Sequence, residues 1–223
     1  MLATVAVLGA APLLAQVPPS ASEVRAFAPL HAAAHAGDGD RLAAALKHDP
    51  QVIDSRDAHG RTALHVATFA RQRGAIRQLA AAGANLGALD NDRYDAVTIA
   101  AVADDEETLA LLLSLGASAK LTTSRYDGTA LIAAAHLGHD GVVRQLIKAG
   151  APLDHVNNLH WTAAIEAVVL GDGGPRHQAC LRALVDAGAD LTLADRDGRT
   201  PLQLARARGF SAMVRILESA PRR

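Results

Sequence analysis

Aromatic residues are scarce in this chain of 223 residues, which contains one Trp, two Tyr and three Phe. Half of the residues are nevertheless hydrophobic, so Ala, Leu and Val supply most of the apolar content. Because β-sandwiches depend on aromatic and β-branched side chains, this composition argues against them and favours helices packed closely on small side chains. The chain is long enough to bury a substantial core.

Cysteine and net charge are nearly absent as well. The single cysteine, Cys180, excludes an internal disulfide, a cysteine-rich zinc site and an iron–sulfur cluster. The 22 basic and 23 acidic residues give a formal net charge of −1, and no basic stripe is present. This balance argues against a nucleic-acid-binding protein, which would need cations to neutralise phosphates.

The N-terminal segment is uncharged up to Glu23. Residues 2–14 form an apolar run of signal-peptide length, and the small residue Ala15 follows, so we expect export with cleavage after Ala15. Two features do not favour a signal peptide: no basic residue precedes the run, and Leu13 stands three positions before the cut. A membrane anchor is the alternative, although the run is shorter than the ~20 residues that a bilayer requires.

These features predict a signal peptide at 1–15 and a linker at 16–26. The expected location is the periplasm, with secretion as an alternative and a cytoplasmic location if the first segment is not a signal. No stable membrane anchor is expected after cleavage.

A four-residue motif recurs along the rest of the chain. Its copies begin at positions 28, 62, 95, 129, 162 and 200, with spacings of 34, 33, 34, 33 and 38 residues. A fixed period of this size is typical of a repeat architecture. The copies are Ala28-Pro29-Leu30-His31, Thr62-Ala63-Leu64-His65, Asp95-Ala96-Val97-Thr98, Thr129-Ala130-Leu131-Ile132, Thr162-Ala163-Ala164-Ile165 and Thr200-Pro201-Leu202-Gln203.

Each copy predicts a pair of helices. The Thr or Asp that opens the motif is expected to cap a short Ala-rich helix, and a glycine nine residues later suits a left-handed turn. A second helix with an apolar pair three residues apart follows, and a Gly-Ala pair ends it. The predicted turn glycines are Gly37, Gly138, Gly171 and Gly209, and the terminal ones are Gly83, Gly116, Gly150 and Gly188.

This pattern resembles the ankyrin repeat family, which has a polar hairpin, a Thr-Pro-Leu-His motif and a Gly-Ala-Asp/Asn ending. The resemblance implies an all-α ankyrin-repeat solenoid of about six helix-turn-helix repeats with β-hairpin or loop fingers. The sequence departs from the pattern at Arg93 in place of Gly, Asp95 in place of Thr, and a five-residue expansion at 171–175. The expected domain spans 27–220, with repeats at about 27–56, 57–89, 90–123, 124–156, 157–194 and 195–220.

The resemblance also implies that a concave surface of hairpin tips and first helices binds another protein. Tyr, Trp and Arg side chains commonly concentrate binding energy at such surfaces. For Trp161 and Tyr126 two roles stay open, as binding anchors or as side chains that fill the seams between hairpins. The predicted partner-binding residues are Trp161, Tyr126, Tyr94, Arg125, Leu159, His59, Arg61, Phe69, His136, Arg196 and Arg199.

Residues that could carry other chemistry are given structural roles. The family resemblance implies that His31 and His65 bond neighbouring loops, and no third ligand accompanies the pair formed by His31 and His35. His136 and His139 are expected to face solvent. Cys180 is expected to be a small buried hydrophobe, and the acidic run 104–107 to begin a helix rather than bind calcium.

No catalytic arrangement, metal site or cofactor motif is recognised, so the chain is predicted not to be an enzyme and to need no cofactor. The expected function is a monomeric, periplasmic adaptor for a protein partner of unknown identity. Two alternatives are a secreted effector that binds host proteins and an accessory factor that supports an exported catalase. The second alternative depends on a resemblance to exported bacterial ankyrin proteins.

Overall fold

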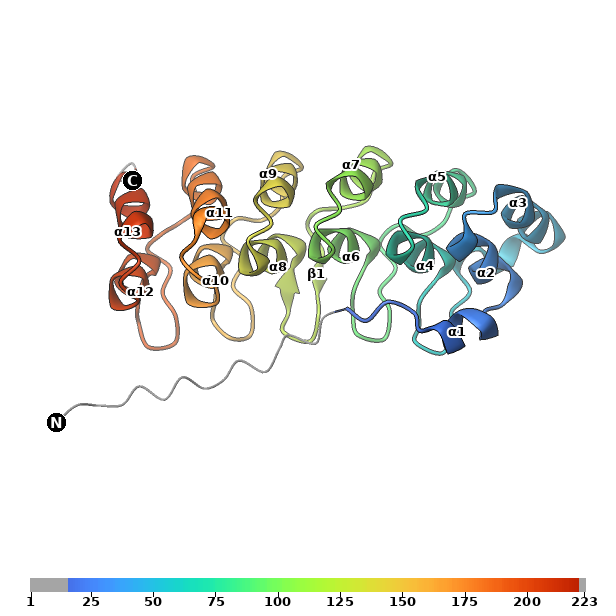
Figure 1. Cartoon of the computed structure of the whole chain (residues 1–223), viewed down its shortest axis with the longest axis horizontal. Coiled ribbons are helices and arrows are strands. Elements are labelled where there is room, and N and C mark those ends of the chain that lie inside the picture. Colours follow the sequence, from blue (N-terminus) through green and yellow to red (C-terminus); the bar gives the residue numbers. More distant parts are fainter. Residues whose placement is uncertain (1–15, 221–223) are drawn as a thin grey trace.

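The computed structural model describes residues 16–220. The predicted signal peptide at 1–15 lies outside the described residues. Six pairs of antiparallel helices stand side by side in one elongated row, with the loops that join consecutive pairs along one edge (Figure 1). The predicted all-α solenoid of about six repeats is confirmed.

One helix of each pair lies toward the edge formed by the loops, and we call these the inner helices. They are α2 (Pro29–Ala36), α4 (Ala63–Phe69), α6 (Ala96–Val102), α8 (Ala130–Leu137), α10 (Ala163–Val169) and α12 (Pro201–Ala207). The outer helices are α3 (Gly39–His48), α5 (Arg73–Ala81), α7 (Glu106–Ser114), α9 (Asp140–Lys148), α11 (Pro175–Asp186) and α13 (Ser211–Glu218). A short 3₁₀ helix, η1 (Pro50–Asp54), follows α3.

Small side chains let the inner helices approach one another closely. Ala34, Ala67 and Ala101 are completely buried between neighbouring helices. The larger buried side chains come mainly from the outer helices, where pairs such as Ile76 and Leu79 face the inner row. The close packing of the helices requires small side chains, and this requirement also accounts for the low aromatic content.

Side-chain caps fix the start of the inner helices as predicted. Asp95, Thr129 and Thr162 each accept a hydrogen bond from the backbone N–H three residues later. These bonds satisfy one of the free donors of the first helical turn. The N-cap of the first inner helix is Ala28, whose side chain has no oxygen and makes no such bond.

The turns between the paired helices follow the prediction with one exception. Gly37, Gly138 and Gly209 adopt left-handed conformations with φ between 69° and 72°, whereas Arg71 and Asp104 take this conformation in two other repeats. The prediction for Gly171 was wrong. The five-residue expansion moves the left-handed position to Gly173, with φ of 73°.

The expansion at 171–175 lengthens an outer helix. Helix α11 has 12 residues, whereas α5, α7 and α9 each have 9. In its additional turn, Arg176 Nη2 lies 2.6 Å from Asp104 Oδ2, a residue 72 positions earlier. Because solenoid repeats normally contact only their neighbours, this ion pair is an unusual link across an intervening repeat.

The segment 16–26, expected to be a linker, contains helix α1 (Ala21–Ala26). Ser20 and Glu23 form a capping box, in which each side chain accepts a hydrogen bond from the backbone N–H of the other residue. The spacing Ser-x-x-Glu was therefore a readable signal for a helix start.

Candidate protein-binding surface

The loops that precede five of the inner helices project from the edge of the stack, and we call them fingers 2 to 6. In finger 2, Asp57 Oδ1 accepts hydrogen bonds from the backbone N–H groups of His59 and Arg61, at 2.8 and 2.9 Å. Fingers 3, 5 and 6 repeat this arrangement, so an Asp or Asn at the base gives each finger one defined turn. The fingers are residues 57–61, 90–94, 124–128, 157–161 and 195–199.

Finger 4 is built differently and is the one β-hairpin found within residues 16–220. Strand β1 (Thr122–Thr123) pairs antiparallel with β2 (Gly128–Thr129). Within this hairpin, Ser124 and Asp127 have left-handed backbones. The other fingers are loops, so the expectation of hairpin or loop fingers is met by both types.

Hydrogen bonds join each finger to the previous one. The backbone N–H of Asn91 donates to His59 O at 3.0 Å, and the N–H of Asn158 donates to Tyr126 O at 2.9 Å. At finger 6 a side chain replaces the backbone donor, because Arg196 Nη2 donates to Asn158 O at 2.5 Å. The fingers therefore form a continuous ladder rather than independent loops.

Two histidines join the inner helices to the next finger, as the family resemblance implied. His31 Nε2 lies 3.0 Å from Arg61 O, and His65 Nε2 lies 3.0 Å from Tyr94 O. Since a carbonyl only accepts, Nε2 carries the proton in both rings. His65 Nδ1 then accepts from Thr62 N, and burial lowers the pKa of this imidazole.

The aromatic and apolar candidates on the fingers are partly buried. Tyr94, Tyr126, Leu159 and Trp161 each retain some exposed surface, as does Phe69 at the end of α4. Burial raises the pKa of Tyr94, and the neighbouring Asp92 adds to the shift. Trp161 also packs against the core, so its two predicted roles, binding anchor and seam filler, both fit this position.

Arg61 is not a surface side chain, contrary to the sequence-based expectation for this finger. Its side chain is 5% exposed, and its guanidinium lies between two carboxylates, 2.7 Å from Asp57 Oδ2 and 2.6 Å from Glu23 Oε1. His59 remains exposed, with Nε2 2.8 Å from Glu23 Oε1. Hydrogen bonds from Ser20 and from Arg61 lower the pKa of Glu23 to about 2. Arg61 therefore holds helix α1 against finger 2.

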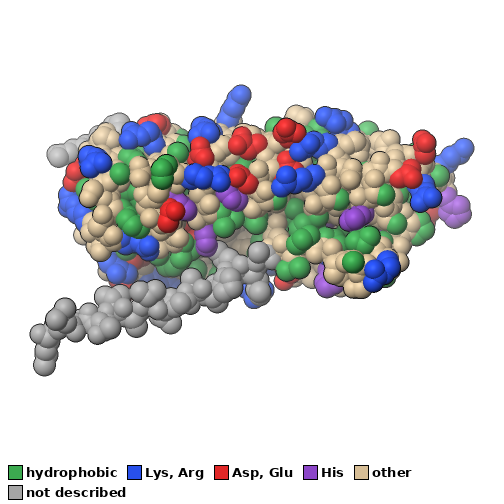
Figure 2. All heavy atoms as spheres, viewed as in Figure 1, with side chains coloured by type: hydrophobic (Ala, Val, Ile, Leu, Met, Phe, Trp, Pro, Cys, Tyr) green, Lys and Arg blue, Asp and Glu red, His purple; other side chains and the backbone are tan. Residues whose placement is uncertain are grey.

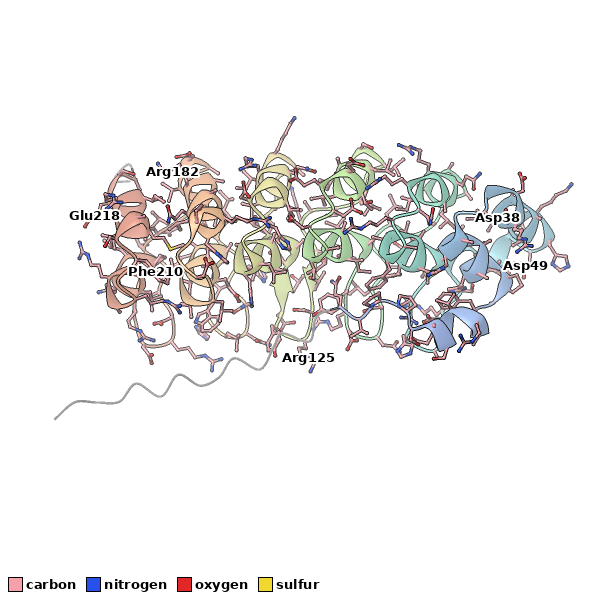
Figure 3. The ribbon with its side chains drawn as sticks, viewed as in Figure 1. Asp38, Asp49, Arg125, Arg182, Phe210 and Glu218 are labelled. Carbon is pink, nitrogen blue, oxygen red and sulfur yellow. The ribbon has the colours of Figure 1, made fainter. Side chains whose placement is uncertain are left out.

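The remaining cationic candidates lie at exposed finger tips but have intramolecular partners. Arg125 extends from the tip of finger 4 (Figure 3), and its Nη2 is 3.8 Å from Asp92 Oδ1. Arg199 Nη2 is 2.9 Å from Asp195 and 2.6 Å from Asp197. The pairs of Arg125 with Asp92 and of Arg199 with Asp197 are exposed and contribute little to stability, so a binding partner can compete for these side chains at small cost, whereas the carboxylate of Asp195 is buried.

Comparisons with known proteins agree with this architecture. The family models for ankyrin repeats match residues 59–91 and, as three copies, residues 97–195. The chain is 32% identical over 189 residues to the ankyrin repeat protein YahD of Escherichia coli strain K12, covering 84% of this chain and 93% of YahD. The chain belongs to the ankyrin repeat family.

Solved structures of other ankyrin repeat proteins superimpose on most of the chain. An ankyrin repeat domain from Acinetobacter baumannii AYE is 44% identical, with a TM-score of 0.80 over 86% of this chain and 97% of that one. The ankyrin repeat protein EF0377 is 29% identical, with a TM-score of 0.79 and coverages of 86% and 98%. Ankyrin repeat domains are typically non-catalytic binding modules, and an ankyrin repeat protein such as this one is generically a protein-binding scaffold.

One polar cluster of this ankyrin repeat protein was missed from sequence. Glu166 of α10 is 4% exposed and accepts from Asn157 Nδ2 at 3.0 Å, while His136 Nδ1 lies 3.1 Å from its other oxygen. Asn157 is the base of finger 5, so the cluster connects helix α8 to the finger that carries Trp161. The sequence signal was a Glu at a position where the other inner helices have Ala, Val, Ile or Leu.

The expectation that His136 and His139 face solvent was therefore wrong. The side chain of His136 is 18% exposed, and that of His139 is 13% exposed. His139 Nδ1 lies 2.9 Å from Ala101 O in the preceding repeat. The His136 ring lies beside Glu166 of the next repeat, and the turn after α8 is covered by the additional turn of α11, from which His177 Nε2 reaches His136 O at 2.9 Å.

The predicted structural roles of the acidic run and of Cys180 are confirmed. Asp105 accepts from Thr108 N at 3.0 Å and caps α7, and Arg73 Nη2 lies 2.9 Å from its carboxylate. Cys180 is fully buried in α11, and burial raises the pKa of its thiol to about 12. Among the described residues, no group of three or more metal-ligating side chains comes together, and no helix is long and apolar enough to cross a membrane.

Proposed function

We propose that this protein is a non-enzymatic adaptor that captures a protein partner on its fingers and inner helices. The observation that carries the proposal is the position of Tyr94, Tyr126, Leu159 and Trp161 as partly exposed side chains on fingers that are hydrogen-bonded into one ladder. A preorganised surface loses little conformational entropy when a partner binds, which favours affinity.

The surface properties of the two edges support this assignment. Acidic and basic side chains gather along the outer helices and the turns, whereas hydrophobic side chains lie closer to the fingers (Figure 2). The charged edge consists largely of ion pairs between repeats, such as Arg73 with Glu107 and Arg176 with Asp104. The finger edge therefore offers the apolar and aromatic groups that typically act as anchors.

We also propose that the chain acts in the periplasm as a monomer after cleavage behind Ala15. The uncharged apolar run at 2–14 supports export. Cell fractionation with mass spectrometry of the N-terminus tests it. A periplasmic protein that begins at Gln16 is expected, release into the medium would favour the secreted alternative, and a cytoplasmic protein that retains residues 1–15 would contradict export.

Partner capture is tested with single alanine variants on the fingers. Trp161→Ala, Tyr126→Ala and Leu159→Ala are compared with Arg182→Ala, a matched control because Arg182 is exposed in α11 on the opposite edge (Figure 3). Affinity capture from periplasmic extract identifies the partner, and titration of the purified pair gives Kd. We expect Trp161→Ala to weaken binding at least tenfold while Tm stays nearly unchanged, and Arg182→Ala to change neither.

The result that separates the two roles of Trp161 is the pattern of losses. A large drop in Tm for Trp161→Ala with binding lost in proportion assigns this residue to the seam between fingers. Unchanged Kd for all three finger variants would contradict the proposed binding surface.

A further inference from the structure

The chain covers part of its own finger surface. Helix α1 is held on finger 2 by Glu23, which pairs with Arg61 at 2.6 Å and with His59 at 2.8 Å. Arg61 also lies over the ring of Phe27, 6.0 Å from its centroid. From this attachment the preceding residues run as an extended segment past fingers 2 and 3 (Figure 1).

The segment 16–20 lies in a groove of the finger surface. Gln16 and Val17 line a pocket together with Phe69 of α4 and with Asp92 and Tyr94 of finger 3. Pro18 and Pro19 favour an extended backbone and lack N–H donors, so the segment cannot extend the hydrogen-bond ladder of the fingers. The same groove contains four of the residues expected to bind a partner, namely His59, Arg61, Phe69 and Tyr94.

The segment fits this groove poorly. The side-chain Nε2 of Gln16 is buried without a hydrogen-bond acceptor, and Val17 is 71% exposed although the aromatic side chains are close. A buried donor without an acceptor costs roughly 1–3 kcal/mol. The segment therefore covers the groove without satisfying its own polar groups.

The charge of the groove also lacks a complement in the segment. Its lining includes three carboxylates, those of Glu23, Asp90 and Asp92, and the side chains of Arg61 and His59 in this lining both contact Glu23. Asp92 is 69% exposed, and its nearest cation is Arg125 at 3.8 Å. Residues 16–20 carry no charged side chain, and cleavage behind Ala15 would add only the α-ammonium group of Gln16 at the end of the segment, so a ligand with a cationic side chain beside Asp92 would match this groove better.

We propose that residues 16–20 are a built-in cover over the groove of fingers 2 and 3, and that the partner displaces them with an extended segment that places an apolar side chain against Phe69 and Tyr94 and a Lys or Arg beside Asp92. This inference deepens the proposed function and rests on it for the identity of the surface. The ion pair of Glu23 with Arg61 retains the cover near the groove.

The position of the cover is measurable by NMR without any partner. A nitroxide attached to the Val17→Cys variant of a chain that begins at Gln16 broadens nearby amide resonances. Cys180 stays unlabelled because its thiol is fully buried and its pKa is raised to about 12. We expect broadening at Asp92 and Tyr94 and none at Arg199 in finger 6.

The attachment is tested by adding Glu23→Gln to the labelled chain. We expect this substitution to reduce the broadening at Tyr94 at least twofold, since it removes the carboxylate that holds α1. Glu218→Gln is the matched control, because Glu218 forms an exposed ion pair with Arg206 at the other end of the stack. Absence of broadening in fingers 2 and 3 of the labelled parent, with Tm unchanged by labelling, would overturn the cover.

The preference for a cation is tested in the same labelled chain. Gln16→Lys should increase the broadening at Tyr94 and Gln16→Glu should decrease it, and Asp92→Asn should abolish the difference. Added peptide KVPPS should reduce the broadening in competition with the cover, whereas EVPPS should not. Equal effects of the two charges would overturn the stated partner chemistry, and they would do so even if the finger variants lose partner binding as proposed.

Discussion

The two halves of the stack close the seams between repeats with different chemistry. In the first half, His31 and His65 occupy the fourth motif position and reach the carbonyl groups of the next finger. In the second half, Ile132 and Ile165 occupy this position and offer only apolar contact. The fourth motif position therefore makes a hydrogen bond to the next finger in the first half and an apolar contact in the second half.

Other residues take over the polar link in the second half. His155 Nε2 lies 2.6 Å from Asp127 O, and the buried cluster of Glu166, Asn157 and His136 connects α8, α10 and finger 5. In both halves a buried polar link therefore connects an inner helix to a finger, and residues from different positions supply it. Substitutions in the two halves should therefore be costly at different motif positions.

The largest effect is expected in the first half, for His65→Ala. This residue is completely buried, and its loss leaves a cavity and removes the acceptor for Thr62 N, although Tyr94 O keeps the bond from Asp90 N. We expect the free energy of unfolding to fall by about 2–4 kcal/mol. Urea denaturation measures it, with the exposed His48→Ala as control, and a loss as small as that of the control would contradict a polar seam.

The corresponding test in the second half is Glu166→Ala. It leaves Asn157 Nδ2 without its acceptor and removes the partner of His136, so we expect a loss of about 1–3 kcal/mol. Glu166→Gln is the conservative control, because an amide oxygen can still accept from Asn157. If both variants unfold like wild type in urea, the second half does not depend on this cluster.

The pH dependence of stability should report the buried imidazole of the first half. Burial lowers the pKa of folded His65, so the unfolded chain binds more protons below its ordinary pKa of about 6.5, and stability falls as the pH decreases from there. The slope contributed by this residue should approach about 1.4 kcal/mol per pH unit.

Urea titrations between pH 7 and 5.5 measure this slope, and His65→Gln should remove it. Carboxylates with shifted pKa values change the stability in a lower pH range. Burial raises the pKa of Asp95 from its ordinary 3.8, so this residue stabilises the folded state as the pH falls. Four other carboxylates have lowered pKa values in the folded state, so their contribution to stability is lost in acid. They are those of Glu23, Asp57, Asp105 and Asp195. For the test between pH 7 and 5.5, an equal slope of stability against pH in wild type and in His65→Gln would show that His65 does not titrate as described.

The smallest effect is a gain at the first repeat, for Ala28→Thr. His31 Nδ1 is buried without a partner, whereas the equivalent atom of His65 bonds Thr62. A hydroxyl at position 28 can donate to His31 Nδ1 and cap α2, which should add about 1 kcal/mol of stability. Ala28→Val has the same shape without the hydroxyl, so a gain that it shares would contradict the hydrogen-bond explanation.

Much of the fold was determined by the sequence itself. The period of the motif, the capping Thr and Asp residues and the Gly-Ala endings located six helix pairs, because each of these signals acts within one or two turns of chain. Burial of Cys180 and the helix start at Asp105 followed from the same local patterns. The capping box of Ser20 and Glu23 was equally local and could have been recognised.

The site depended instead on contacts between distant parts of the chain. The sequence predicted Arg61 to be a surface residue, but in the fold Glu23, 38 positions away, places a carboxylate beside it. The ring of His136 lies beside a carboxylate that Glu166 supplies from 30 positions later, and Arg176 from the additional turn of α11 reaches back 72 positions. Local periodicity fixes which face of a helix is apolar, but the charge and burial of a side chain depend on what the folded neighbours bring to it, which only the tertiary structure decides.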